Sequence, residues 1–597
     1  MSAVLNKKWN LSNDADPDKI KLFAEDLNVP YALSKILITR GITNKPDAKK
    51  FFMPSLDSLH DPFLMKGMDI AVERLLEVIK NKEKILIYGD YDVDGTSGVS
   101  MFHIFMNDLE VPNNVFIPDR FTDGYGLSNS GVDHASAENI KLIVAIDCGI
   151  TAVDTVEYAK SHNIDIIICD HHQPPENLPQ AFAVLDSLQF ECAYPFKHLC
   201  GTGVAFKFVQ AICMKLGIDN YLKLLDFVAV ATAADMVPVI EENRVLLYYG
   251  FKQIVEKPRP SFESLIKISG FKFENICTSN VVFSLGPRIN AVGRLGDATR
   301  AVEFLTCDDI NKVDDLAGVL EFENSNRRKI DNEIYIQAQD SYEKYLDGIN
   351  QDDVAIILHN PEWHPGVLGI IASRMVEKYY KPSIIMTTFN GHAKGSARSI
   401  NNFNIYEALK QCSSEFSGLV QFGGHYHAAG VEVELGRVNE FRECFNKIAR
   451  NLINISDEGA DILIPEIRID AELDLNEINK RFVKILKHFE PFGPNNMTPI
   501  FVSYNLQIVG EPRVFNNTTC VFKIRKPNGN NGYKNYHHDN IMECVFYKPP
   551  VSDGCDNFTL RTGNFIDIVY SVEENHWNER TKIQLRIRDY KPSTINN

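Results

Sequence analysis

The sequence of 597 residues lacks any Cys-x-x-Cys pair, although it contains 12 cysteines. The spacing of these cysteines argues against a zinc ribbon and against a thioredoxin-like redox site. No apolar run approaches the roughly 20 residues that a membrane span requires, and the first residues are too polar for a secretory signal. We therefore expect a cytoplasmic protein that has no membrane partner.

An excess of basic residues is also absent. Lys and Arg number 62 against 79 Asp and Glu, which gives a net charge of −17. Because a nucleic-acid enzyme usually presents a basic face to phosphate, composition alone gives no reason to expect DNA as a substrate. Hydrophobic residues make up 44% and charged residues 24%, as in an ordinary globular protein, and the length predicts roughly three or four domains.

What the sequence does contain is a set of acids at the ends of short apolar runs. Residues 164–169 end in Asp170-His171-His172, residues 84–88 break into Gly89-Asp90-Tyr91-Asp92-Val93-Asp94-Gly95, and residues 142–146 break into Asp147-Cys148-Gly149. A fourth acid, Asp235, ends the Ala-rich segment 227–234. Such runs fit buried parallel strands whose carboxyl ends face one crevice. Converging acids repel one another unless cations hold them, so the sequence predicts a two-metal centre.

The order of these motifs resembles the DHH phosphoesterase superfamily and, within it, the RecJ family of bacterial single-strand exonucleases. Tyr88 stands where many other branches of the superfamily have a metal-binding histidine, and RecJ-like proteins share this departure. The similar segments are 88–95, 147–150, 170–172 and 233–238 for the catalytic motifs, 120–128 and 286–295 for RecJ-type stretches, and 395–399 and 422–425 for a DHH-associated domain.

The resemblance implies a metal-dependent phosphodiesterase. It assigns two divalent ions, with Mn²⁺ favoured by the histidine ligand and Mg²⁺ possible. His172 matches a position near the substrate phosphate, and Asp170 would orient His171. Asp90 is either a direct ligand or a supporting group. The residues that match the metal-ligand positions are Asp92, Asp94, Asp147, His171 and Asp235.

Several residues are candidates for substrate binding. Arg120 follows the apolar run 115–118 and could clamp a phosphate bidentately, with a surface salt bridge as the alternative. The resemblance adds Arg288 and Asn290 as phosphate contacts. A further group lies in small-residue segments where backbone amides can approach phosphate closely, and consists of Ser396, Arg398, Ser399, Gly424 and His425. Cys148 and Cys169, which flank the acids, are either ligands or small buried fillers, and we favour fillers.

The residue pattern predicts an α/β protein with two α/β lobes joined by a long helix. Short apolar strands alternate with amphipathic helices in the first lobe, and residues 308–346 contain neither proline nor a strand-like run. Alternating residues near the C-terminus fit a small antiparallel β-barrel, and the resemblance implies an OB fold. The expected divisions are an N-terminal lead-in 1–68, a DHH catalytic domain 69–307, a connecting helix 308–348, a DHH-associated domain 349–455 and an OB-fold nucleic-acid-binding domain 456–597.

The function implied by the resemblance is 5′→3′ exonuclease action on single-stranded DNA in repair and recombination, with release of 5′-mononucleotides. A single-strand-binding protein or a helicase is a possible partner. Two alternatives stay open: a DHH-family phosphodiesterase for short oligonucleotides or cyclic dinucleotides, and a non-catalytic DNA-binding relative. The C-terminal barrel weighs against the first alternative, and the intact acid and histidine set weighs against the second.

Overall fold

The computed structural model describes residues 7–12, 15–119, 122–124, 126–346, 353–456, 458–516, 518–527, 541–547, 560–577 and 580–593. The chain divides into two compact units. One, here named the α/β unit, comprises Pro46–Arg327 and His488–Thr498; the other, the C-terminal unit, comprises Met1–Lys45, Arg328–Lys487 and Pro499–Asn597. The N-terminal lead-in is thus divided between the two units at Lys45.

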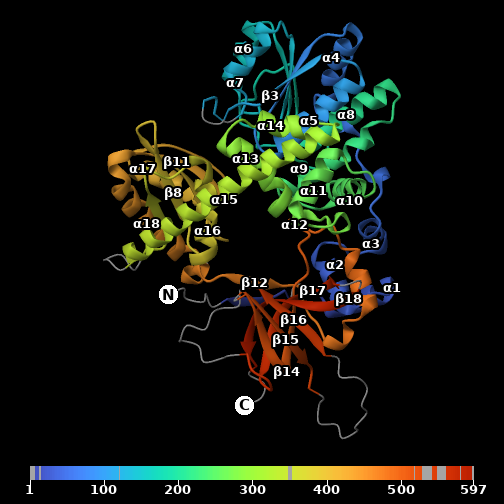
Figure 1. The fold of residues 1–597 in the computed structure, drawn as a ribbon, viewed down its shortest axis with the longest axis vertical. Coiled ribbons are helices and arrows are strands. Elements are labelled where there is room, and N and C mark those ends of the chain that lie inside the picture. Colours follow the sequence, from blue (N-terminus) through green and yellow to red (C-terminus); the bar gives the residue numbers. More distant parts are fainter. Residues whose placement is uncertain are drawn as a thin grey trace. The chain divides into compact units, whose positions relative to one another are not determined.

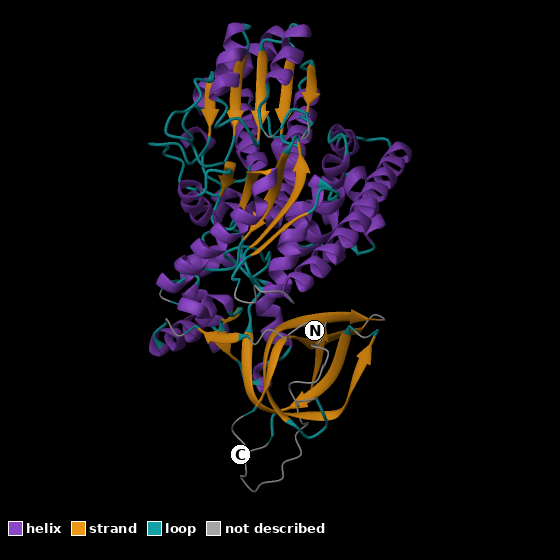
Figure 2. Cartoon of the chain, turned by 90° about the vertical axis from the view of Figure 1, so that its left-hand side faces the viewer, coloured by secondary structure: helices purple, strands orange, loops and turns teal. Residues whose placement is uncertain are grey.

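A parallel sheet forms the centre of the α/β unit, with the strand order β3-β2-β4-β5-β6 (Figure 2). Its strands are β2 (Ile85–Gly89), β3 (Asn113–Phe116), β4 (Leu142–Ile146), β5 (Asp165–Cys169) and β6 (Ala183–Leu185). Helices cover both faces of this sheet, so alternate residues of each strand belong to two different hydrophobic cores. Ile87 and Val144 pack against α4, α5 and α8, whereas Leu86 and Ile143 pack against α6 and α7. Burial on both faces explains why these strands are continuous apolar runs.

The helix that follows β2, α5, begins at Val93. Asp92 is the reason, since its side chain accepts hydrogen bonds from the amides of Asp94 and Gly95 and so caps the helix. The helices of the unit are α3 (Lys45–Phe52), α4 (Met68–Asn81), α5 (Val93–Asp108), α6 (Asn129–Ala137), α7 (Val153–Ser161), α8 (Gly201–Leu216), α9 (Leu225–Ala234), α10 (Glu241–Glu256), α11 (Pro260–Ser269), α12 (Thr278–Asn280), α13 (Gly286–Leu295) and α14 (Thr299–Leu305).

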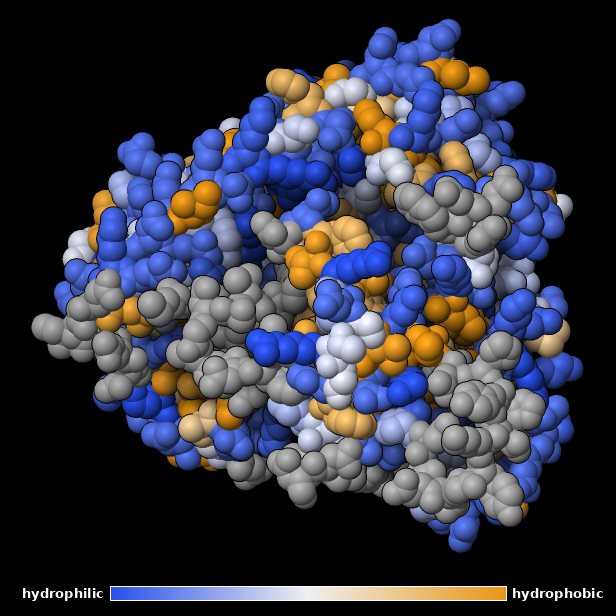
Figure 3. All heavy atoms as spheres, turned by 60° about the horizontal axis from the view of Figure 1, so that its bottom comes forward, coloured by the Kyte–Doolittle hydropathy of each residue, from blue (hydrophilic) through white to orange (hydrophobic). Residues whose placement is uncertain are grey.

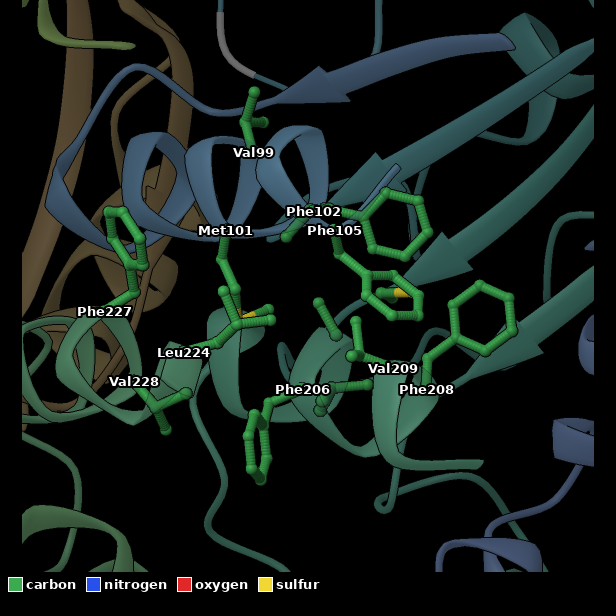
Figure 4. Packing of buried hydrophobic residues seen from close by; sticks show 14 of the residues in the cluster. Val99, Met101, Phe102, Phe105, Phe206, Phe208, Val209, Leu224, Phe227 and Val228 are labelled. Atoms are coloured by element: carbon green, nitrogen blue, oxygen red, sulfur yellow. The ribbon is translucent and has the colours of Figure 1, made fainter. Parts of the chain in front are cut away.

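Large apolar side chains from α5, α8 and α9 fill the space beneath the sheet (Figure 4). Phe102 of α5 stacks on Phe208 of α8 with ring centroids 5.8 Å apart. Both rings are fully buried, and burying an aromatic side chain of this size contributes about 1.5–3 kcal/mol. This packing holds α5 against α8, and the starts of both helices carry residues of the site described below.

A long helix, α15 (Ile310–Leu346), is present as the sequence predicts, and the chain passes from the α/β unit to the C-terminal unit within it, after Arg327. Beyond it lies a second α/β domain with the sheet order β10-β11-β9-β8-β7. The pair β7–β8 is parallel and the other pairs are antiparallel. Its elements are β7 (Ile356–His359), α16 (Leu368–Tyr379), β8 (Ser383–Phe389), β9 (His392–Arg398), α17 (Ile405–Glu415), β10 (Leu419–Gly424), β11 (Ala428–Glu434) and α18 (Val438–Ile455).

The strands that follow β12 form a strongly curved sheet with the order β13-β14-β15-β16-β18-β17, in which β14 also pairs with β17 (Figure 2). The sheet is not wholly antiparallel, since β16 runs parallel to β18 and β13 runs parallel to β14. Alternation of residues along a strand shows which side faces the core but not the direction of its neighbour. The elements are β13 (Ala471–Glu472), α19 (Lys480–Lys487), β14 (Phe501–Phe515), β15 (Thr519–Arg525), β16 (Met542–Tyr547), β17 (Phe565–Trp577) and β18 (Arg580–Pro592).

The start of the lead-in belongs to this part of the C-terminal unit. Its first strand, β1 (Lys8–Leu11), pairs in parallel with β12 (Glu466–Ile469). Trp9 packs against the core that contains Val502 and Val569, and its indole donates a hydrogen bond of 2.7 Å to Asp589. The helices α1 (Pro17–Leu27) and α2 (Tyr31–Thr39) follow (Figure 1). The part of the lead-in up to Lys45 therefore belongs to the C-terminal unit, and the part from Pro46 belongs to the α/β unit.

The surface shown in Figure 3 is mainly hydrophilic, and hydrophobic residues occur on it in separate patches. Within the described part of the chain, we find no helix whose length and apolar character would let it cross a lipid bilayer.

Candidate metal centre

Four aspartates occupy the first position after four neighbouring strands of the α/β unit. Asp90, Asp147, Asp170 and Asp186 follow β2, β4, β5 and β6. The strand register pairs Gly89 with Ile146, Ile146 with Cys169, and Cys169 with Leu185, so the acids are neighbours along one sheet edge. The carboxyl edge of a parallel sheet is where open α/β domains bind ligands.

Two further acids lie on the loop and helix that follow β2. Asp92 caps α5, and the carboxylate of Asp94 accepts hydrogen bonds from the amides of Gly201 (2.7 Å) and Thr202 (2.8 Å) at the start of α8. A helix N-terminus stabilises a carboxylate placed in this way. Gly201 also allows Asp147 to lie close to the start of α8, because a Cβ there would lie 2.5 Å from Cβ of Asp147.

His171 is the point at which the acids converge. Its Nε2 lies 3.2 Å from Oδ1 of Asp147, 3.7 Å from Oδ2 of Asp235 and 3.8 Å from Oδ2 of Asp94. Ligand atoms within 4.8 Å of one another form three overlapping groups: Asp147, His171 and His172; Asp94, His171 and Asp235; and Asp90, Asp92 and Asp147. The five residues predicted as metal ligands from the sequence therefore all belong to one cluster.

The cluster is electrostatically costly without a cation. Burial, together with the charge of Asp94, raises the pKa values of Asp92, Asp147 and Asp235, and those of Asp147 and Asp235 most. Burial lowers the pKa of His171, so its imidazole is held neutral, the form that binds metals. These shifts are those of ligands crowded together in a site built for positive charge.

The donor set fits divalent cations. Oδ1 of Asp147 is buried, and no described residue donates a hydrogen bond to it. Asp147 also has a φ of +62°, a left-handed conformation that is uncommon for residues other than glycine and recurs at functional sites. Carboxylates together with one imidazole suit Mn²⁺, with Mg²⁺ as the harder alternative. The ligands present are therefore those that a two-ion site of this kind requires.

The carboxylate of Asp170 bonds the ring of His172 but only the backbone amide of His171, so it orients the ring of His172 rather than, as expected from the sequence, that of His171. Oδ1 of Asp170 accepts hydrogen bonds from the amide of His171 (2.7 Å) and from Nδ1 of His172 (2.7 Å), while Oδ2 accepts one from the amide of Ile150 (2.9 Å). Burial alone would raise the pKa of Asp170, but the hydrogen bond from His172, the charge of that histidine and the hydrogen bond from the Ile150 amide together outweigh burial, so the pKa is lowered. At His172, burial alone would lower the pKa, but the hydrogen bond to Asp170 and the charges of the nearby aspartates raise it to about 9.

The RecJ-type segment near the site has a mixed arrangement. Arg288 is buried, and its guanidinium contacts Oε2 of Glu321 at 2.5 Å and the carbonyl of Ser284 at 2.8 Å. In this structure Arg288 is thus committed to an internal ion pair. Asn290, two residues later in α13, has a buried Oδ1 that accepts no hydrogen bond from a described residue. Arg120, predicted to contact phosphate, lies outside the described residues.

In the second α/β domain, neighbouring strands bring the predicted substrate residues together. Arg398 donates a hydrogen bond to the Ser396 hydroxyl at 2.9 Å, and β11 joins their strand β9 to β10, which ends in Gly424. His425 follows and is exposed, and Ser399 binds the carbonyl of Phe403 at 2.6 Å through its hydroxyl. Burial lowers the pKa of Arg398.

Three features of these sites were not predicted from the sequence. Asp186 is the first; its signal is the short run Ala183-Val184-Leu185 that ends in an acid. The second is the pair of α8 amides that hold Asp94. The third is the start of α16, where a Cβ on Gly369 would lie 2.9 Å from Arg398 and 3.1 Å from the Ser396 hydroxyl. A helix N-terminus beside an arginine and a serine forms an anion-binding environment.

Cys148 and Cys169 are buried beside the acids, and burial raises the pKa values of both thiols. Neither belongs to the groups of ligand atoms found among the described residues. Both therefore behave as small buried side chains, as favoured from the sequence.

Comparison with known proteins finds relatives for each of the three main domains of this chain. Family models match the DHH family N-terminal domain at residues 84–232, the DHHA1 domain at 352–451 and the RecJ OB domain at 469–589. The single-stranded-DNA-specific exonuclease RecJ of Bacillus subtilis (strain 168) is 33% identical over 98% of this chain and 70% of its own length. The protein of that name from Escherichia coli (strain K12) is 32% identical over 79% of this chain and 83% of its own.

Solved structures agree with this fold. RecJ from Thermus thermophilus in complex with Mn²⁺ matches with a TM-score of 0.80 at 24% identity, over 98% of this chain and 79% of that chain. An exonuclease RecJ bound to manganese matches with a TM-score of 0.57 at 29% identity, over 68% of this chain and 99% of that chain.

The strand-end acids, the paired histidines and the sequence of domains define a metal-dependent DHH-type phosphoesterase. The acids and histidines of the described residues form groups that could hold divalent metal ions. Within that class, the chain belongs to the RecJ family.

Proposed function

We propose that this protein is a single-stranded-DNA-specific 5′→3′ exonuclease that hydrolyses phosphodiester bonds and releases 5′-mononucleotides, in DNA repair and recombination. The observation that carries the proposal is the convergence of three carboxylates on Nε2 of His171 at 3.2–3.8 Å. Identities of 32–33% to exonucleases named RecJ supply the substrate class.

Asp92, Asp94, Asp147, His171 and Asp235 would hold two divalent cations, with Asp90 as a sixth donor or a support. Cations bound there lower the pKa of water and offset charge on the phosphoryl oxygens. The α8 amides fix Asp94 and the α5 amides fix Asp92, so these ligands are ordered before substrate arrives. Asp170 keeps the ring of His172 in one orientation. His172 is therefore suited to hold a phosphoryl oxygen or to supply a proton to the departing 3′-oxygen.

The second α/β domain would bind the 5′ end of the strand. Arg398, Ser396 and the start of α16 together offer a guanidinium, a hydroxyl and a helix N-terminus to a phosphate. Ser399, Gly424 and His425 lie on the same strand ends. Arg120, Arg288 and Asn290 are proposed to contact phosphates nearer the metals, and Arg288 would do so only if it exchanged Glu321 for the substrate.

The curved C-terminal sheet is proposed to bind the strand beyond the active site, as OB folds do by stacking bases and following the backbone. The proposed domains are those expected from the sequence, 1–68, 69–307, 308–348, 349–455 and 456–597, with the lead-in divided at Lys45. The described cysteines are all free thiols, which fits a reducing compartment and supports the cytoplasm. A single-strand-binding protein or a helicase is the proposed protein partner.

A product assay tests the proposal. Linear single strands labelled at the 5′ or the 3′ end are incubated with the protein and Mn²⁺ or Mg²⁺. We expect the 5′ label to appear at once as a mononucleotide, while the 3′-labelled strand shortens gradually. Circular single strands should stay intact, and Asp147→Ala should be inactive. Immediate release of the 3′ label, or cleavage of circles, would contradict the proposed polarity and end dependence.

A further inference from the structure

A segment from late in the chain forms part of the α/β unit. His488–Thr498, which in sequence joins α19 to β14, is grouped with the residues around the metal centre and lies beside α12 (Figure 1). Arg244 of α10 is almost fully buried. Its guanidinium donates hydrogen bonds to the backbone carbonyl of Phe51 in α3. It also donates to three backbone carbonyls of the segment, those of His488, Phe489 and Pro491.

The same segment contacts the loop that follows the metal ligand Asp235. The amide of Val239 donates a hydrogen bond of 2.7 Å to the carbonyl of Pro494. Gly493 packs so closely that a Cβ there would lie 2.3 Å from Cγ2 of Val239 and 3.7 Å from Cγ2 of Thr278. Val239 is fully buried, so neither the hydrogen bond nor the packing is replaced by water.

The loop between Asp235 and Val239 is short and has little freedom. Asp235 ends α9, Met236 has a φ of +56°, and the carbonyl of Pro238 accepts a hydrogen bond of 3.0 Å from Asn243. Displacing Val239 therefore displaces the chain four residues from the ligand. Metal ligands depend on such outer contacts for their orientation.

We propose that Gly493 and Pro494 are positioning residues for the metal ligand Asp235, acting through Val239, so that the late segment completes the metal site. The proposal rests on Asp235 as a ligand and hence on the proposed function. Only two residues separate the end of the segment His488–Thr498 from the start of strand β14 in the OB domain. The region that would bind DNA is thereby linked in the chain to the loop of a metal ligand.

The test is Gly493→Ala in the full chain, which adds one methyl group against Val239 at a position without positive φ. We expect the dissociation constant for Mn²⁺, measured by calorimetry or by the resonance of free Mn²⁺, to rise about 10–100-fold. Long single-strand binding in the absence of metal should be unchanged. Gly493→Ala combined with Val239→Ala removes the clashing Cγ2 and should restore much of the Mn²⁺ affinity.

Gly436→Ala is the matched control, because nothing lies within 4 Å of a Cβ there. A folded Gly493→Ala protein with the Mn²⁺ affinity of Gly436→Ala would overturn the proposal. If Gly493→Ala does not fold, Asn496→Ala decides, since it removes hydrogen bonds of 2.8 Å to the carbonyls of Phe489 and Pro491 and adds no atom. Unaltered Mn²⁺ affinity there would also overturn it. Failure of the wild type to bind Mn²⁺ would instead refute the metal centre itself.

Discussion

Asp186 lies beside Asp170 at the carboxyl ends of neighbouring strands. The amide of Asp170 donates a hydrogen bond of 3.0 Å to the carbonyl of Leu185, which continues the β5–β6 register to the two acids. Asp186 is fully buried, and its Oδ2 accepts no hydrogen bond from a described residue. Burial, with a further contribution from the charge of Asp170, raises the pKa of Asp186 to about 7.

We therefore expect Asp186→Asn to change how stability depends on pH. The folded state holds the Asp186 proton more tightly than the unfolded state, so its contribution is fully present below pH 4 and is lost as the pH rises through about 7. At pH 4 the variant should be close to the wild type in stability, and at pH 8 it should be more stable by at most about 4 kcal/mol. Urea unfolding at both pH values measures this. Asp315→Asn, on the exposed surface of α15, is the control, and a pH-independent difference for Asp186→Asn would contradict the expectation.

Asp147→Asn tests the metal centre with a side chain of the same shape that also tolerates a positive φ. We expect loss of Mn²⁺ binding and of hydrolysis, because a carboxylate ligand is replaced. Without metal, the variant should unfold at higher temperature than the wild type, since the raised pKa of Asp147 reflects burial and repulsion from Asp94. Turnover like that of the wild type at saturating Mn²⁺ would refute the assignment.

A buried ion pair should contribute strongly to the stability of the α/β unit. Nζ of Lys207 lies 3.1 Å from Oε1 of Glu242 and donates to the carbonyl of His60 at 2.7 Å, with both charged side chains fully buried. Lys207→Met should cost about 3–5 kcal/mol because it leaves the charge of Glu242 buried. Lys160→Met, which breaks an exposed pair with Glu157, should cost less than about 1 kcal/mol. Similar losses for the two variants in urea unfolding would show that burial is not decisive.

The DNA-binding role of the C-terminal sheet is testable at Arg586. Its guanidinium lies 5.2 Å from the ring centroid of the half-exposed Tyr547, while its neighbour Leu585 is buried. Arg586→Ala should weaken long single-strand binding and make its salt dependence shallower by about 0.7 in the log–log slope, for one lost phosphate contact. Hydrolysis of very short oligonucleotides should persist.

Lys410→Ala, an exposed change on α17, controls for net charge in that experiment. An unchanged ratio of long-strand to short-oligonucleotide activity in Arg586→Ala would favour the small-substrate alternative. Point variants are preferable to truncation near Ile462, because truncation would also delete His488–Thr498 from the α/β unit.

Much of the metal centre could be predicted because its chemistry is local in the sequence. A strand buried on both faces is a continuous apolar run, which can be recognised in the sequence. Because the carboxyl ends of parallel strands share one edge of the sheet, acids that follow such runs, as Asp147 and Asp170 do, are expected to lie close together. The helix Ile310–Leu346 was likewise indicated by the absence of proline and of strand-like runs.

Other features depended on segments that are distant in the sequence. The amides that hold Asp94 come from α8, 107 residues later, and Arg288 pairs with Glu321 on a different helix. The carbonyl that holds Val239 comes from Pro494. Periodicity and capping determine which face of a segment is buried and where it ends. They do not state which distant segment supplies a buried group's partner, because that choice is made only when whole elements pack against one another.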